Sequence, residues 1–372
     1  MNRQVGVAIV GIGSISGIYL KNITTVFREL RIVGIYDLMP DRAQKAAAEY
    51  GIEKVYSSMR EILADPTAKI VLNLTRPAEH YQVIKDALLA GKHVYTEKPL
   101  AATLEQAAEL VKLAEEKGLL LGGAPDTFLG AGIQTCRKLI DSDMIGSPIG
   151  AAAFMVCHGH ESWHPDPEFY YKKGGGPLLD MGPYYLTALV NLLGGVKSVA
   201  GAVATPFSQR IITSQPRSGD VIDVEVATTV AGMLHFENGA LGTLYTTFDV
   251  YYPAGSQARI EIYGTKGTLV VPDPNGFGGP IRLLRPEQGE YRDMPLLFDY
   301  QENSRALGLA DMAKALCTGR RFRATGAQAY HVLEIMVRLL ESAEQGKTLP
   351  LSTRYDRGPA MENNPVHGIL DK

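Results

Sequence analysis

Cysteine is scarce in this chain of 372 residues, and so is an excess of charge of either sign. The three cysteines, Cys136, Cys157 and Cys317, are far apart and odd in number, which argues against a disulfide framework and favours reduced thiols. A formal net charge of −3 gives no support for binding to nucleic acid or to an anionic membrane. We therefore expect a cytoplasmic protein with neither of these partners.

Long uninterrupted apolar runs are also missing. Val5–Leu20 is apolar and superficially similar to a secretory signal. Glycines and serines interrupt this run, and no other stretch approaches the roughly 18 apolar residues that a membrane helix needs. The residues that interrupt it are Gly11, Gly13, Ser14, Ser16 and Gly17.

The length favours two domains, and the first third of the chain alternates short apolar runs with helical patterns. Strands that are apolar on both faces and alternate with helices predict a doubly wound parallel sheet, an α/β Rossmann domain over residues 1–123. The predicted strands are Val5–Val10, Ile32–Asp37, Ile70–Leu74, His93–Thr96 and Leu119–Gly122. The predicted helices are Asp41–Tyr50, Ala78–Ala90 and Leu104–Lys117.

The pattern changes after about Gly123, where helices and then several strand-like runs predict an α+β domain over residues 124–350. Turn signals at 237–239 and 265–267 indicate hairpins, so the sheet should be mostly antiparallel. The last residues, 351–372, predict an irregular tail. The predicted helices are Phe128–Asp141, Asp180–Leu193, Asn303–Cys317 and Ala327–Glu344, and the predicted strands include Val221–Val230, Leu241–Val250 and Arg259–Tyr263.

A glycine-rich turn joins the first strand to the helical pattern that follows it. Gly11 permits the tight turn, Gly13 lets the backbone approach a pyrophosphate, and Ser14 and Ile15 lead into a helix N-terminus that favours anions. The third glycine of the dinucleotide fingerprint is replaced by Ser16, so the motif alone is weak evidence.

An acidic residue strengthens the nucleotide prediction. Asp37 ends the second strand twenty residues after Gly17, where a carboxylate would accept a hydrogen bond from a ribose diol. The same carboxylate repels a 2′-phosphate, so NAD is favoured over NADP, although Arg42 nearby could soften this preference. The plainer alternative for Asp37 is a solvated loop acid.

Two further segments carry residues suited to chemistry. Lys98 follows the strand His93–Thr96, and ligands of open parallel sheets bind beyond the carboxyl ends of the strands. Asp180 and Tyr184 follow a glycine-rich segment and are four apart, so they project from one face of a helix. Asp180 could instead be an N-cap and Tyr184 a packing aromatic.

Together these segments resemble the glucose–fructose oxidoreductase / inositol dehydrogenase family (Gfo/Idh/MocA). The resemblance rests on the glycine-rich start, on Glu97-Lys98-Pro99, on the segment leading to Asp180, and on residues 263–267. It implies a Rossmann domain, then a domain whose open sheet commonly mediates homodimers or homotetramers. It also implies that Lys98, Asp180 and residue 184 form the catalytic group. Many members have histidine where this chain has Tyr184, so the identity of the base is open.

A mechanism can be written for either base. The ammonium of Lys98 would favour the phenolate of Tyr184 and would stabilise a developing alkoxide, with Asp180 orienting the lysine or the substrate hydroxyl. In this interpretation Tyr184 is the general acid/base. In the alternative, Lys98 is the direct acid/base and Tyr184 only donates a hydrogen bond.

The remaining binding residues are predicted from loops. We expect the nicotinamide to lie near the loop after the strand Ile70–Leu74, and the ribose to contact Glu97. The substrate should meet residues 126–128 and the aromatic and histidine-rich segment 158–171, which suit the C–H faces and hydroxyl edges of a sugar. The nicotinamide residues are Asn73, Thr75, Arg76, Pro77 and His80. The substrate residues are Asp126, Thr127, Phe128, His158, His160, Trp163, His164 and Tyr171.

The resulting hypothesis is an NAD-dependent dehydrogenase or reductase that acts on a CH–OH group of a sugar, inositol or glycoside. The histidines of segment 158–164 could suggest a metal, but their spacing is not that of a structural metal site, and nicotinamide chemistry needs none. Two alternatives remain open. The enzyme could keep NAD bound and oxidise a glycoside transiently to allow elimination or cleavage, or the chain could be a non-catalytic dinucleotide sensor.

Overall fold

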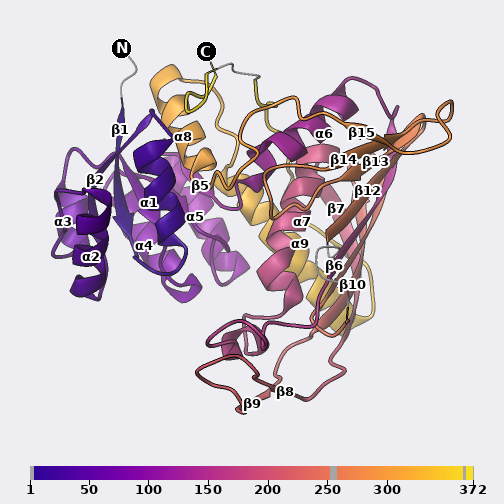
Figure 1. Cartoon of the computed structure of the whole chain (residues 1–372), viewed down its shortest axis with the longest axis horizontal. Coiled ribbons are helices and arrows are strands. Elements are labelled where there is room, and N and C mark those ends of the chain that lie inside the picture. The colour runs from indigo at the N-terminus through magenta and orange to yellow at the C-terminus, as the bar shows by residue number, and fades with distance from the viewer. Residues whose placement is uncertain (1–3, 252–257, 363–365, 372) are drawn as a thin grey trace.

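The computed structural model describes residues 4–251, 258–362 and 366–371. Figure 1 shows two lobes, each built around its own sheet, with the N-terminal part of the chain in one lobe and most of the later part in the other. None of the helices in the described ranges is both long and apolar enough to cross a membrane.

The first lobe is built on a parallel sheet with the strand order β2-β1-β3-β4-β5. Every residue of β1 is buried, because helices cover both faces of the sheet. This confirms the predicted Rossmann architecture. The strands are β1 (Val5–Val10), β2 (Leu30–Tyr36), β3 (Ile70–Asn73), β4 (His93–Thr96) and β5 (Leu121–Gly123). The helices are α1 (Ser16–Thr25), α2 (Pro40–Tyr50), α3 (Met59–Ala64), α4 (Pro77–Leu89) and α5 (Leu104–Glu116).

The second lobe contains a larger sheet, ordered β15-β14-β13-β12-β6-β11-β10-β7-β16 in the described ranges. Its pairs are antiparallel except for β6 with β11, which confirms a mostly antiparallel sheet. Helices α6, α7 and α9 lie against one face of it (Figure 1). The helices are α6 (Ala131–Asp141), α7 (Pro177–Leu193), α8 (Leu307–Thr318) and α9 (Gly326–Gln345). The strands are β6 (Pro148–Val156), β7 (Val196–Ala204), β10 (Thr229–Phe236), β11 (Leu241–Thr247), β12 (Ala258–Gly264), β13 (Gly267–Val271), β14 (Ile281–Leu284), β15 (Arg292–Met294) and β16 (Leu349–Pro350).

One predicted strand was wrong. The run Val221–Val230 divides into β9 (Val221–Asp223), which pairs with β8 (Gln209–Ile211), and the start of β10. The amide of Glu225 donates to the carbonyl of Tyr171, which diverts the chain between the two strands. A small hairpin, β8–β9, therefore extends from the large sheet beside segment 158–171 (Figure 1).

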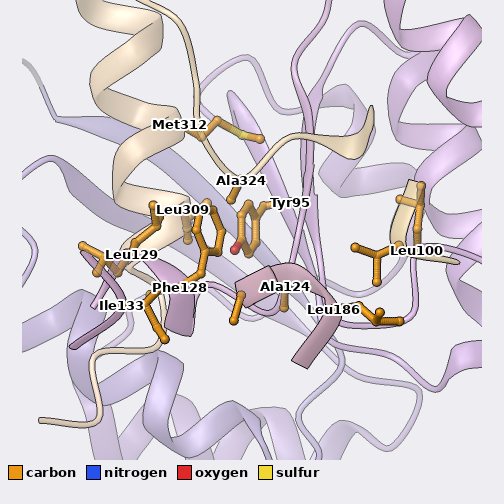
Figure 2. Packing of buried hydrophobic residues seen from close by; sticks show 14 of the residues in the cluster. Tyr95, Leu100, Ala124, Phe128, Leu129, Ile133, Leu186, Leu309, Met312 and Ala324 are labelled. Carbon is orange, nitrogen blue, oxygen red and sulfur yellow. The ribbon is translucent and has the colours of Figure 1, made fainter. Parts of the chain in front are cut away.

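The later part of the chain also supports the first lobe. The amide of Gly123 donates to the carbonyl of Ala324, and α8 and α9 pack beside β5. Figure 2 shows Tyr95 of β4 next to Phe128, with Leu309 and Met312 of α8 around them. Residues beyond the predicted boundary at 123 thus complete the core of the first lobe.

The predicted C-terminal tail contains no helix or strand within 351–362 and 366–371, but it is docked. The amide of Leu370 donates to a carboxylate oxygen of Glu29 over 2.7 Å, and the amide of Arg28 donates to the carbonyl of Gly368. Asp371 is 4% exposed and pairs with buried Arg323. The tail therefore ties the α8 region to the first lobe. Residues 363–365 and Lys372 of the predicted tail lie outside the described residues.

Candidate active site

The turn after β1 has the geometry that an anion needs. Gly11 has a φ of +94°, and a Cβ there would lie 2.7 Å from the backbone of Leu74, so only glycine fits without strain. A Cβ at Gly13 would meet nothing within 4 Å. Helix α1 starts at Ser16 with no side-chain cap, which leaves first-turn N–H groups available to a phosphate. Ser14 is exposed and Ile15 half-buried in the turn between them.

Asp37 lies at the carboxyl end of β2, as predicted. One carboxylate oxygen accepts the amide of Ile12 over 2.7 Å, and the other accepts the amide of Met39 over 2.8 Å. Asp37 thereby holds the glycine-rich turn in place. Each oxygen keeps a further acceptor position, so the same carboxylate can still receive a ribose hydroxyl.

The loop after β3 divides the predicted nicotinamide residues into two groups. Thr75, Arg76 and Pro77 are at least partly exposed at the start of α4. Asn73 and His80 have no exposed surface. The Asn73 side chain accepts from Thr75 and donates to Thr96, so it braces the loop from behind.

His80 occupies a similar supporting position. Its ring nitrogens lie 2.6 Å from the carbonyl of Pro99 and 3.1 Å from that of Thr75, which ties the loops after β3 and β4 together. Burial lowers the pKa of His80, whereas the carbonyls of Pro99 and Thr75 oppose this effect. Direct contact of His80 and Asn73 with a cofactor stays a prediction, and the structure gives both residues a supporting role.

Glu97 follows β4 and faces helix α1. It accepts the hydroxyl of Tyr19 over 2.7 Å on one carboxylate oxygen and the amide of Lys98 over 3.0 Å on the other. Tyr19 is fully buried in α1 and was not predicted from the sequence, because nothing local marks it. This contact links α1 to the segment that carries the lysine.

Lys98 and Asp180 meet across the junction of the two lobes. The ammonium of Lys98 donates to a carboxylate oxygen of Asp180 over 2.9 Å and to its carbonyl over 2.8 Å. The same nitrogen lies 5.4 Å from the ring centroid of Tyr184, one helical turn further along α7. The three residues predicted as the catalytic group are therefore brought together, and α7 begins three residues earlier than predicted, at Pro177.

Charge stabilises this pair. Burial alone would lower the pKa of Lys98, but Asp180 and Tyr184 outweigh it and hold that pKa above its ordinary value. Burial would raise the pKa of Asp180, but Lys98 and His160 lower it to about 2. At neutral pH the site therefore holds an ammonium and a carboxylate, and the imidazole of His160 lies 3.4 Å from the second carboxylate oxygen.

Tyr184 is neutral in this environment. Burial raises its pKa, with Glu97 adding to the effect, whereas Lys98 and Arg305 oppose it. Arg305 comes from the segment before α8 and was not predicted, because no local pattern connects it with α7. Two cations therefore oppose the effect of burial on the pKa of this phenol.

The predicted substrate segment contributes some of its residues to the site. The ring of His160 packs edge-on against Tyr170, with centroids 4.1 Å apart, and against Phe248 and Trp163. Tyr170 itself was not predicted. Burial, and then the charge of Asp180, raise its pKa to about 12. The prediction chose the neighbouring Tyr171, and sequence alone could not separate the two adjacent tyrosines.

Tyr171 and His158, in the same segment 158–171, make their contacts with residues other than Asp180. Tyr171 is fully buried and donates to Glu161 over 2.7 Å, within a network that includes Arg210. His158 stacks on Tyr251 with centroids 3.6 Å apart.

Trp163 is largely exposed and packs edge-on against His164, with centroids 5.4 Å apart. The structure thus groups His160 with Asp180, whereas Tyr171 belongs to a buried network of its own. Among the described residues, no group of three or more His, Cys, Asp or Glu side chains is arranged to hold a metal ion.

The other predicted substrate stretch is buried. Asp126, Thr127 and Phe128 are each at most 3% exposed, and Phe128 is part of the core shown in Figure 2. One carboxylate oxygen of Asp126 accepts the amide of Gly308 at the start of α8 over 3.0 Å. These residues lie where the two lobes join, and their contact with substrate stays a prediction.

Buried Asp126 should make the free energy of unfolding depend on pH. Burial raises its pKa to about 6, above the unfolded value of about 3.9. A carboxyl with a raised folded-state pKa stabilises fully below about pH 4 and loses that contribution as pH rises through about 6. Asp126→Asn has no carboxyl group to ionise. We therefore expect the free energy of unfolding of the variant, relative to that of wild type, to be roughly 1–3 kcal/mol higher at about pH 8 than at about pH 4.

Urea unfolding of both proteins at the two pH values checks this expectation. Glu79→Gln, at an exposed position, serves as the control and should follow wild type. A constant difference between Asp126→Asn and wild type across the pH range would contradict it.

Comparisons with known proteins follow the same division of the chain. Residues 5–123 match the oxidoreductase family with an NAD-binding Rossmann fold, and residues 133–270 match the Gfo/Idh/MocA C-terminal domain. The chain belongs to the Gfo/Idh/MocA family. It is therefore an oxidoreductase of this family, as the resemblance of its motifs implied.

Relatives of this Gfo/Idh/MocA protein include scyllo-inositol 2-dehydrogenase (NAD(+)) of Bacillus subtilis, 27% identical over 73% of this chain and 75% of the relative. D-glucoside 3-dehydrogenase of Escherichia coli is 25% identical over 93% of this chain and 97% of the relative. A solved levoglucosan dehydrogenase in complex with NADH and L-sorbose has a TM-score of 0.80 at 21% identity, covering 94% of this chain and 99% of that chain. The last match shows the shared fold.

Proposed function

We propose that this protein is an NAD-dependent dehydrogenase or reductase that acts on a CH–OH group of a sugar, inositol or glycoside. The observation that carries the proposal is the meeting of Lys98 and Asp180 beside Tyr184, at the carboxyl edge of the Rossmann sheet. Relatives named as inositol and glucoside dehydrogenases support this substrate class. NAD rather than NADP is favoured by the carboxylate at Asp37.

The residues suggest a division of labour. The ammonium of Lys98 has three N–H donors, and Asp180 occupies two, which leaves one for a substrate oxygen. In the oxidative direction the phenolate form of Tyr184 takes the proton of the substrate hydroxyl and becomes a phenol. The ammonium of Lys98 favours this phenolate against the effect of burial, and it stabilises the substrate oxygen as negative charge develops on it. A bound nicotinamide would accept the hydride. His160 lies beside Asp180 and packs against Tyr170, so both rings would border a substrate bound there.

A substrate panel tests the proposal. Sugars, inositols and glycosides are incubated with NAD or NADP, and NADH or NADPH absorbance is followed. We expect sustained NADH release with at least one of them, faster than with NADP. Modified product without net NADH would favour transient oxidation with bound NAD. No turnover of any compound across the pH range would favour a dinucleotide sensor.

Asp37 supplies a test of cofactor choice. In Asp37→Ala the glycine-rich turn loses two hydrogen bonds, and the ribose loses the carboxylate that would accept its hydroxyl. We therefore expect roughly tenfold weaker NAD binding and relaxed discrimination against NADP. Asp37→Asn keeps an acceptor for Ile12 but removes the charge. It should relax the discrimination and weaken NAD binding less. Calorimetry measures the dissociation constants of NAD and NADP for each variant. If the ratio of these two constants is unchanged in both variants, Asp37 does not bind the ribose.

The oligomeric state and location belong to the same proposal. Phe154, Met233 and Leu241 are exposed on neighbouring strands of the large sheet, which supports a homodimer or homotetramer formed through this face. Cys136 and Cys157 are free thiols, as expected in the reducing cytoplasm. Sedimentation of wild type and Met233→Glu tests the interface, because a charge there should favour monomers.

A further inference from the structure

Arg210 ties an irregular segment of the active site to the hairpin β8–β9. Residues 157–167 form no helix or strand, so the position of the backbone that carries His160 depends on other contacts. Arg210 lies in β8 with its side chain buried. One terminal nitrogen of its guanidinium donates to the carbonyl of His158 over 2.8 Å and to that of Phe248 over 3.2 Å. The guanidinium therefore holds the chain two residues before His160.

The same guanidinium also holds the residue after His160. Its Nε donates to one carboxylate oxygen of buried Glu161, and the other oxygen accepts the hydroxyl of Tyr171 over 2.7 Å. The carbonyl of Glu161 accepts the amides of Thr213 and Ser214, in the loop between β8 and β9, each over 2.9 Å. The chain is thus bonded to the hairpin on both sides of His160.

A second carboxylate completes this buried network. The Nη1 of Arg210 donates to one oxygen of Asp249 over 3.0 Å, and the other oxygen accepts the hydroxyl of Thr229 over 2.7 Å. The side chains of Arg210 and Asp249 are each 5% exposed. A buried ion pair commonly adds little net stability compared with apolar packing, because both charges lose their water. The fixed geometry of the network therefore points to a role in placing the backbone that it contacts.

Gly159 allows the network to approach the backbone closely. Its φ is +81°, and a Cβ at this position would lie 2.1 Å from a carboxylate oxygen of Glu161 and 2.2 Å from the hydroxyl oxygen of Tyr171. Both atoms belong to the network, so a side chain at this position would displace it. The backbone next to His160 therefore depends on a residue without a side chain.

His160 connects this network with the carboxylate of Asp180. Its Nε2 lies 3.4 Å from one oxygen of that carboxylate. The imidazole packs edge-on against Tyr170 and Trp163, with ring centroids 4.1 Å and 5.2 Å away. A shift of the backbone on either side of His160 would move the imidazole relative to Asp180, where the substrate is proposed to bind.

We propose that Arg210 is a positioning residue that fixes His160 beside Asp180 and thereby shapes one border of the substrate site. It acts through its bonds to the carbonyl of His158 and to the carboxylate of Glu161. The inference rests on the proposed function, in which the ring of His160 borders the substrate. The lysine and the tyrosine proposed for proton transfer lie on other elements, so Arg210 should affect substrate binding more than the chemical step.

The test replaces Arg210 by lysine, which keeps the positive charge but loses the planar set of donors. For Arg210→Lys we expect a substrate KM about tenfold higher, a kcat within about threefold of wild type and an unchanged affinity for NAD. The matched control is Arg217→Lys. Arg217 lies in the loop of the same hairpin and pairs with Asp166, but its side chain is 31% exposed. The control should behave as wild type, and an equal rise of KM in both variants would overturn the inference.

A double-mutant cycle shows whether Arg210 acts through His160. In a His160→Ala background there is no imidazole to position, so Arg210→Lys should raise KM by less than about twofold. Gly159→Ala displaces the same network without removing a charge, and it should raise KM in wild type but not in that background. A rise of about tenfold for Arg210→Lys in both backgrounds would contradict the inference, because Arg210 would then act independently of His160.

A further measurement does not depend on turnover. Trp163 is the only tryptophan of the chain and packs against His160, so its fluorescence reports on this contact. The emission of Trp163 should change in Arg210→Lys and should match wild type in Arg217→Lys. If the emission is unchanged in Arg210→Lys, the inference fails. If wild type oxidises no substrate but the emission changes in Arg210→Lys alone, the proposed function fails while the placement of His160 by Arg210 stands.

Discussion

Lys98→Met should reduce turnover by roughly a thousandfold while leaving the affinity for NAD within about twofold of wild type. Methionine has a similar length but no N–H, so the substrate oxygen loses its donor and Tyr184 loses a neighbouring cation. The glycine-rich turn and Asp37 lie on other loops and should be unaffected. Steady-state kinetics and calorimetry with NAD measure the two effects separately.

The matched control is Lys117→Met, which replaces an exposed lysine at the end of α5 and should behave as wild type. Lys98→Arg adds a test of geometry, because it keeps the charge but places planar donors against Asp180. We expect it to be strongly impaired as well. Unchanged turnover in Lys98→Met would overturn the site, and an equal loss of NAD affinity would make the lysine a cofactor ligand instead.

The dinucleotide half of the site is predictable because its signals are local. The turn after β1 needs a positive φ, which favours glycine at position 11. Asp37 and Lys98 each follow the end of a strand, and the apolar residues of these strands indicate that the strands are buried. Parallel strands end at one edge of a sheet, so residues distant in sequence meet there. Asp180 and Tyr184 were predictable from helical spacing, but their meeting with Lys98 requires the docking of the two lobes.

Tertiary contacts decide what the sequence does not mark. Strand β6 contains Gly150 and three alanines, residues depleted in strands, yet it lies at the centre of the large sheet because β11 and β12 pair with it. The placement of Arg305 is equally hard to predict, since its main chain is held by a hydrogen bond from Asn22, which is distant in the sequence. Asp126 and Phe128 were expected near the substrate, but both are buried, and the amide of Gly308 at the start of α8 donates to Asp126.

Asp311→Asn should lower the free energy of unfolding by about 3–5 kcal/mol, the usual cost of breaking a buried ion pair. Asp311 is fully buried in α8, and its oxygens accept from Arg320 over 2.6 Å and from the amide of Arg323 over 2.8 Å. It also pairs with the guanidinium of Arg323, which is 4% exposed. The amide keeps the shape but leaves two arginines facing one carboxylate, that of Asp371 in the tail.

Urea unfolding followed by circular dichroism measures this loss, and Asp220→Asn provides the matched control. Asp220 also pairs with an arginine, Arg217, but its side chain is 53% exposed, so its replacement should cost no more than about 1 kcal/mol. Because Asp371 follows Leu370, which is bonded to Glu29, Asp311→Asn should also speed amide exchange at Leu370. Equal costs for the two variants would mean that the buried cluster does not hold the tail between the lobes.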